Sequence, residues 1–169
     1  NAAGAEKETR QYAFDLAGSG FHYEAGDALG VWPTNCANLV GDMLGALKLP
    51  AASIVRVKGH GELALGEALS RHHDITRITP EVLQFVHERT GSDELAALLQ
   101  PDNKEALRQW LWGRQLIDLL RAFPVAASAA DWLAVLKRLQ PRLYSISSSP
   151  KVDPREVQFE QFAATHGAR

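Results

Sequence analysis

This sequence of 169 residues contains one cysteine, one methionine and no long hydrophobic run. Cys36 alone can form neither an internal disulfide framework nor a cysteine-based zinc site. No stretch approaches about 18 apolar residues, so we expect no segment to span a bilayer. Residues 1–8 lack the apolar core of a signal peptide, and we expect a cytoplasmic protein. The first residue is Asn1 rather than methionine, which indicates a piece of a longer chain.

The chain also lacks a large excess of charge of either sign. The chain has 18 lysine and arginine residues against 20 aspartate and glutamate residues, a net charge of −2. This balance gives no electrostatic reason to expect binding to nucleic acid or to an anionic membrane. Hydrophobic residues make up 46% of the chain, a fraction that excludes a disordered tail and allows a folded core without disulfide or metal.

Hydrophobic periodicity changes along the chain and predicts its organisation. Residues 9–34 and those from Pro141 onward alternate as short strands, whereas 35–140 mainly have the helical period. The predicted strands are 9–16, 21–23, 28–32, 53–57, 142–148 and 156–160. This order predicts an α+β fold: an antiparallel β-barrel, incomplete here because few strands are present, with an inserted all-helical domain. The predicted boundaries are 6–35 and 141–162 for the β portion and 36–140 for the helical domain.

Capping residues mark the ends of the predicted helices. Thr79 followed by Pro80 is a strong start signal, and Gly91 is a natural residue to end that helix. The predicted N-caps are Asn35, Thr79, Ser92, Asp102 and Ser128, the last two in capping-box patterns with Glu105 and Asp131. Helical spacing predicts that three tryptophans belong mostly to the core: Trp110, Trp112 and Trp132.

The residues that could carry chemistry gather in Arg142–Ser149. In a strand, Arg142 and Tyr144 lie on one face and Leu143 and Ser145 on the other. Arginine offers a planar fork for phosphate oxygens, tyrosine a flat surface for an aromatic ligand, and serine a hydroxyl donor. Such a strand could hold a nucleotide-like cofactor. On these residues alone, a solvated, serine-rich strand end is the more common arrangement.

A second segment, Tyr23–Asn35, contains glycines at positions that permit bends or close backbone approach, Gly26 and Gly30. Asp27 can accept hydrogen bonds from backbone donors at the bend. For most of these residues we expect a structural role, in a turn between two strands.

Together the two segments resemble the FAD-binding region of the diflavin reductase family. That family has a Tyr-x-x-Gly-Asp-x-x-Gly-Val-x-Pro-x-Asn segment, matched from Tyr23 to Asn35, and an Arg-x-Tyr-Ser-Ile-x-Ser-Ser segment, matched from Arg142 onward. Residues 69–76 and 113–120 are also similar to the family, and the residues around Pro141 most resemble its sulfite reductase branch. The resemblance covers about residues 6–158.

The resemblance implies a part of an NADPH-dependent flavoprotein oxidoreductase. In such a protein, hydride passes from NADPH to FAD, and single electrons pass on to FMN and to a metal-containing acceptor such as a sulfite reductase hemoprotein. FMN-binding and NADPH-binding domains of the same parent chain would be the partners. The inserted region would be the connecting domain that orients the FMN domain toward FAD.

The resemblance also implies the site residues, carried over position by position. The implied cofactor-binding residues are Arg142, Leu143, Tyr144, Ser145, Thr76 and Gly113. Arg142 would contact the FAD pyrophosphate and Tyr144 would stack on the isoalloxazine ring. Ser145, the implied catalytic residue, would lie beside flavin N5, where the hydride arrives.

This sequence also departs from the family pattern. The further strands, the Gly-x-x-Ser/Thr pyrophosphate segment, and the FMN and NADPH domains of the family have no match among its residues. Residues 159–169 do not resemble the strand expected there. We therefore expect the chain alone to be inactive. The alternative is a different class of protein: a non-catalytic helical docking or spacer module without a cofactor.

Other candidate sites have weaker support. His72 and His73 invite a metal site, but adjacent residues on a helix diverge by about 100° and no further ligands complete the set. Cys36 is expected to be an ordinary packing residue at a helix start. Ser145 lacks the Gly-x-Ser-x-Gly pattern of a hydrolase.

Overall fold

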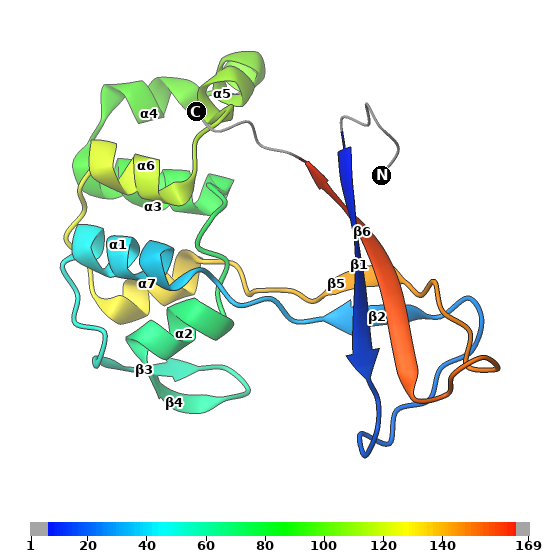
Figure 1. Cartoon of the computed structure of the whole chain (residues 1–169). Helices are drawn as coiled ribbons and strands as arrows, with labels where there is room; N and C mark the ends of the chain where they lie inside the picture. Colours follow the sequence, from blue (N-terminus) through cyan, green and yellow to red (C-terminus); the bar gives the residue numbers. More distant parts are fainter. Residues whose placement is uncertain (1–6, 165–169) are drawn as a thin grey trace. The chain divides into compact units, whose positions relative to one another are not determined.

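The computed structural model describes residues 7–164, and its elements are drawn in Figure 1. They fall into two compact units, each described by itself below. The sheet unit comprises the residues up to Trp32 and those from Pro141 onward, and the helical unit comprises Pro33–Gln140. The fold is mixed α+β with small antiparallel sheets, as the sequence predicts. Among the described residues the strands pair two by two and close no barrel.

The helical unit, all of whose residues are described, consists of helices and one β-hairpin. Its helices are α1 (Ala37–Leu47), α2 (Leu65–Arg71), α3 (Pro80–Thr90), α4 (Asp93–Leu98), α5 (Lys104–Leu111), α6 (Leu116–Ala122) and α7 (Ala129–Val135), with a short 3₁₀ turn at Pro101–Asn103. Strand β3 (Ile54–Val57) pairs with β4 (Gly61–Ala64). The expectation of an all-helical region is wrong here, because Val55 and Val57 alternate with exposed residues and are buried.

A continuous apolar core joins these elements. All members of the core cluster lie between Val40 and Leu136. Trp132 is fully buried at its centre, with its ring edge-on to Phe85 and the ring centroids 4.7 Å apart. Trp112, expected in the core, is instead 86% exposed. It follows the last residue of α5 in an extended conformation, so helical spacing no longer fixes its direction.

Several predicted helix ends are confirmed. The side chains of Thr79 and Ser92 accept hydrogen bonds from the third backbone N–H beyond them. Ser128 and Asp131 form a reciprocal capping box at the start of α7. Gly91 ends α3 in the left-handed conformation, with φ of 63°.

Two predicted caps are wrong. The N-cap of α1 is Cys36, and Asn35 instead donates from Nδ2 to the carbonyls of Leu69 and His73, at 2.6 and 2.7 Å. Asp102 lies within the 3₁₀ turn, and the residue before α5 makes no side-chain cap. Asn35 thus binds carbonyls that are distant in the sequence instead of capping the adjacent helix.

The sheet unit contains two antiparallel pairs. Strand β1 (Lys7–Asp15) pairs with β6 (Glu156–Ala164), and β2 (Ala28–Val31) pairs with β5 (Arg142–Ser145). An isolated bridge between Ile146 and Phe159 links the end of β5 to β6. Figure 1 shows β1 crossing β6 as a long ribbon of two strands.

One strand prediction for this unit is wrong, and another is too short. Residues 21–23 form no strand. The strand predicted at 156–160 extends as β6 to Ala164, because β1 supplies backbone partners along its whole length. Residues 165–169 lie outside the described part of the chain.

None of the helices in the described part combines the length and the apolarity that crossing a bilayer requires.

Candidate functional site

Strand β5 presents the first four predicted site residues. Its register with β2 sets Arg142 opposite Val31 and Tyr144 opposite Leu29. The alternation of a strand then puts Leu143 and Ser145 on the other face, as predicted. Tyr144 is half-buried, whereas the three other site residues of β5 are exposed, Leu143 to 72%.

The Arg142 guanidinium is available to a ligand. Within residues 7–164 it has no hydrogen-bond or ion-pair partner, and the Ser145 hydroxyl has none either. A guanidinium in this state can offer its planar fork of N–H donors to phosphate oxygens. A serine hydroxyl can donate a hydrogen bond to a ring nitrogen, or its oxygen can accept a hydrogen bond from an N–H group.

The Tyr144 ring has one occupied face. It stacks on Phe159, with the ring centroids 4.2 Å apart and the planes inclined by 18°. Phe159 is almost fully buried, so it forms a fixed base for the tyrosine. A planar ligand that stacks on Tyr144 must therefore use the opposite face of the ring.

Tyr23, the first residue of the second motif segment, is hydrogen-bonded to the residues that follow β5. The Tyr23 hydroxyl lies 2.8 Å from Ser148 Oγ and donates to the Glu156 carbonyl at 3.0 Å. Asp27 Oδ2 accepts from the Glu24 N–H at 2.9 Å, and Gly26 takes a φ of 100° that favours glycine. The turn predicted at Gly26 is present, and Tyr23 joins the two motif segments through Ser148.

In the helical unit, Thr76 is held by a carboxylate. Asp74 Oδ1 accepts from the Thr76 N–H at 2.9 Å and from its hydroxyl at 2.7 Å. Arg77 Nε donates to Asp74 Oδ2. Burial raises the pKa of Asp74, but the hydrogen bonds from Thr76 and Arg77 outweigh it and leave the pKa below its ordinary value.

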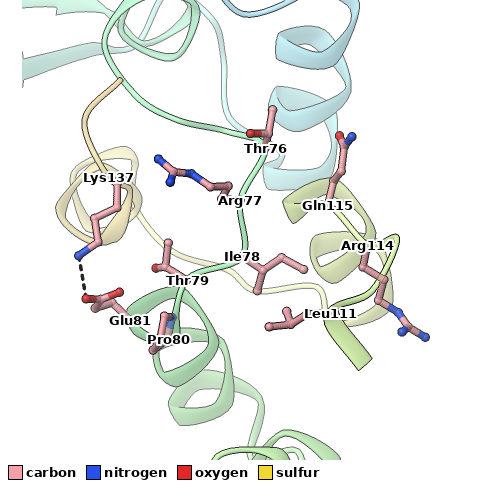
Figure 2. A pocket seen from close by; sticks show the side chains of 10 residues that line it. All are labelled: Thr76, Arg77, Ile78, Thr79, Pro80, Glu81, Leu111, Arg114, Gln115 and Lys137. Atoms are coloured by element: carbon pink, nitrogen blue, oxygen red, sulfur yellow. Dashed lines mark hydrogen bonds and ion pairs between the residues drawn. The ribbon is translucent and has the colours of Figure 1, made fainter. Parts of the chain in front are cut away.

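Thr76 and the residues after Gly113 line one cavity, shown in Figure 2. The Thr76 carbonyl accepts from the Leu116 N–H at 2.9 Å, which brings the two segments together. Gly113 itself ends the α5 segment with a φ of 74°, a conformation that favours glycine. The cavity has a volume of about 630 Å³. Its lining residues are Thr76, Arg77, Ile78, Thr79, Pro80, Glu81, Leu111, Arg114, Gln115 and Lys137.

The charges around this cavity are mostly paired. Lys137 Nζ donates to Glu81 Oε1 at 2.7 Å, and this bond lowers the pKa of Glu81 to about 2. Figure 2 shows this pair and shows the Arg114 side chain extending away from Thr76. Arg114 donates to the Trp110 carbonyl and lies over the Trp110 ring, 4.7 Å from its centroid.

The predicted site residues therefore form two groups, one in each unit. Strand β5 carries Arg142–Ser145, while Thr76 and the neighbours of Gly113 share the cavity of the helical unit. Sequence reasoning missed Phe159 and Asp74. For Phe159 the signal was present, since Val157, Phe159 and their neighbours alternate as a half-buried strand.

The other candidates contribute no site. Burial lowers the pKa of both His72 and His73, and the His72 ring lies 4.1 Å from that of His60. Within residues 7–164, no three histidine, cysteine, aspartate or glutamate side chains are grouped so as to hold a metal ion. Cys36 is exposed, so its predicted packing role is wrong.

The chain is similar in sequence to a known protein family and to known flavoproteins. A family described as "FAD binding domain" matches residues 1–162. The chain is 39% identical over 170 residues to the sulfite reductase [NADPH] flavoprotein alpha-component of Bacillus subtilis, covering 99% of this chain and 28% of that protein. It is 42% identical over 151 residues to the protein of the same name from Vibrio cholerae, covering 89% and 24%. The chain thus spans about a quarter of the length of these relatives.

Proposed function

The chain belongs to the FAD-binding domain family, and we propose that it binds FAD as the FAD-binding and connecting region of an NADPH-dependent flavoprotein oxidoreductase. It is homologous to the FAD-binding region of sulfite reductase flavoprotein alpha-components. Bound FAD would supply the capacity to accept a hydride and release single electrons. The chain's own residues would bind and orient it.

The residues of β5 fit the two ends of a flavin nucleotide. The guanidinium of Arg142, which has no partner among residues 7–164, suits a pyrophosphate, to which it can donate two parallel hydrogen bonds. The face of Tyr144 that Phe159 does not cover suits the flat isoalloxazine ring. Leu143 and Ser145 complete the strand, and we assign the exposed Ser145 hydroxyl to a hydrogen bond beside flavin N5.

The helical unit would supply the remaining contacts. We assign Thr76 and Gly113 to the approach of FAD, supported by the cavity that Thr76 shares with the residues after Gly113. The assigned parts are 6–35 and 141–162 as a portion of an antiparallel FAD-binding barrel and 36–140 as the connecting domain. The expected partners are FMN-binding and NADPH-binding domains of the same parent chain and a hemoprotein acceptor, and the expected compartment is the cytoplasm.

One observation carries this proposal. Arg142 and Tyr144 stand on the same strand. The Arg142 guanidinium is unpaired within the described part of the chain, and the Tyr144 ring is backed on one side by Phe159. A solvated strand end needs neither a supported ring nor a match to this family. A strand that holds a flavin nucleotide needs both binding groups at this spacing.

Two variants and two ligands test the proposal. Riboflavin has the flavin ring but lacks the pyrophosphate. Arg142→Ala should weaken FAD binding by roughly tenfold, the loss of one charge-assisted hydrogen-bond pair, and leave riboflavin binding unchanged. Tyr144→Ala should weaken both ligands. Dissociation constants come from titration of flavin fluorescence with the full chain.

The outcomes separate the proposal from its alternative. Equal effects of Arg142→Ala on FAD and riboflavin would remove the pyrophosphate assignment. If neither variant changes flavin uptake, or if the unchanged chain takes up no flavin, the docking or spacer module without a cofactor becomes the better account.

A further inference from the structure

Four aromatic side chains form a stack across three strands of the sheet unit. The aromatic stack consists of Tyr144 on β5, Phe159 on β6, and Tyr12 and Phe14 on β1. Phe159 is common to every contact: its centroid lies 4.2 Å from that of Tyr144, 5.3 Å from that of Tyr12 and 5.9 Å from that of Phe14. All three interplanar angles are small, between 14° and 21°.

Backbone pairing fixes this arrangement. Phe159 is the direct cross-strand partner of Tyr12, and it also forms the isolated bridge with Ile146. Tyr144 stands two residues before Ile146, so it lies on the same face as Ile146 and diagonal to Phe159. Diagonal neighbours of this kind are within reach when both side chains are aromatic.

Phe159 is much more buried than the two aromatic residues of β1 that contact it. It is 4% exposed, whereas Tyr12 and Phe14 are 38% and 43% exposed. A ligand can therefore not reach Phe159 directly. Whatever Phe159 does for a ligand, it does through Tyr144.

We infer that Phe159 is a positioning residue of the flavin site, which holds the Tyr144 ring in the orientation that an isoalloxazine ring stacks on. This inference rests on the proposed function. By covering one face of Tyr144, Phe159 limits the rotation of that ring before any ligand arrives. A ring that is ordered in advance loses less conformational freedom on binding, so affinity rises without a new contact.

The test must separate positioning from packing, because Phe159 is also one of the few buried side chains of its unit. Phe159→Leu keeps an apolar side chain and removes the flat ring. Phe14→Leu is the matched control: it makes the same change in the same stack, at a residue that stacks on Phe159. Phe159→Tyr retains the flat ring, so it is the conservative variant that should keep the flavin affinity lost in Phe159→Leu.

The measurement is a double-mutant cycle of riboflavin and FAD affinity on the full chain, with melting temperatures to monitor folding. Phe159→Leu should weaken riboflavin and FAD by the same factor, about 2- to 10-fold, the range of an aromatic pair. In the Tyr144→Ala background it should cause no further loss. Phe14→Leu should cause none in either background, and Phe159→Tyr should restore affinity.

Three results would overturn the inference: unchanged affinity in Phe159→Leu, an equal loss in the Tyr144→Ala background, or an equal loss in Phe14→Leu. If Phe159→Leu does not fold, Phe159→Met replaces it in the same cycle, since methionine adapts to irregular gaps. If Tyr144→Ala does not affect binding while Arg142→Ala does, this inference fails and the pyrophosphate part of the proposed function stands. If the unchanged chain binds neither flavin, both fail.

Discussion

The helical unit and the sheet unit differ in how many of their large apolar side chains they bury. In the helical unit, leucine, valine and tryptophan side chains from all over the sequence of 33–140 join one core. In the sheet unit, the large apolar side chains that are buried among the described residues are those of Val157 and Phe159. Exposed large hydrophobic side chains of this unit are Tyr12, Phe14, Phe21, Trp32, Leu143 and Val152.

Under the proposed function, this difference separates a scaffold from a binding surface. The helical unit buries its apolar side chains against one another, and residues of the same unit cap several of its helices. Its stability therefore depends on contacts within it. The sheet unit keeps aromatic rings at its surface, together with the Arg142 guanidinium, which has no partner among residues 7–164. Exposed apolar groups commonly mark the contact with a ligand or another segment. The strand proposed to bind FAD, β5, belongs to the sheet unit, which buries fewer large apolar side chains than the helical unit.

The largest expected effect tests the scaffold half of the comparison. Trp132→Ala removes a fully buried ring that packs on Phe85, and it should lower the free energy of unfolding by about 3–5 kcal/mol. Denaturant unfolding followed by circular dichroism measures the change. Trp112→Ala is the matched control: its ring is 86% exposed, and the change should stay within about 0.5 kcal/mol. Similar losses for both would break the comparison.

A second effect concerns the carboxylate that holds Thr76. Asp74→Asn removes the charge that pairs with Arg77 in a side chain only 9% exposed, and it should cost about 1–3 kcal/mol. Urea unfolding at neutral pH measures it, with Asp153→Asn, at a more exposed pair, as the control.

The pH dependence of this variant has a definite sign. Because the folded pKa of Asp74 is below its ordinary value of 3.8, the contribution of this carboxylate to stability is complete above that value and is lost as the pH falls through the folded pKa. Stability of the unchanged chain should therefore fall in acid more than that of Asp74→Asn. Parallel curves for the two proteins below pH 3.8 would contradict the role of this carboxylate.

A third effect sharpens the comparison from within the sheet unit. Tyr23→Phe removes one hydroxyl and with it the link to Ser148 and the Glu156 carbonyl, which should cost about 0.5–1.5 kcal/mol. Hydrogen exchange at the backbone amides of β6 reports the loss. The amides of α3 should exchange as before, and faster exchange there would show that the two units do not respond separately.

The smallest effect is expected at Leu143. Leu143→Ser replaces a large apolar side chain, but one that is 72% exposed, so the free energy of unfolding should change by no more than about 0.5 kcal/mol. Leu119→Ala, at a fully buried leucine of α6, should cost about 2–5 kcal/mol. A loss above about 2 kcal/mol at Leu143 would mean that this face is covered.

Local rules predicted what local contacts decide. Thr79, Ser128 and Gly91 mark helix ends because their partners lie within four residues, and the sequence displays those partners. Strand alternation alone also divides the candidate site residues of β5 between two faces, and the register of β5 with β2 agrees with that division.

Long-range contacts explain most of the errors. Asn35 binds carbonyls 34 and 38 residues away, which no local pattern contains. Phe159 stacks on Tyr12 and Tyr144, which belong to two strands that only the fold brings beside it. Trp112 fits the helical period, but the helix ends one residue before it.

Hydrogen–deuterium exchange of the full chain with and without FAD tests the central claim most directly. The account predicts that FAD slows exchange in residues 142–148 and in β6, with a second protected segment at Thr76 and the residues after Gly113. The amides in the core of α1, α3 and α7 should not change. No protection in β5, or protection confined to the helical unit, would contradict the assignment of the FAD site to the Arg142–Ser145 strand.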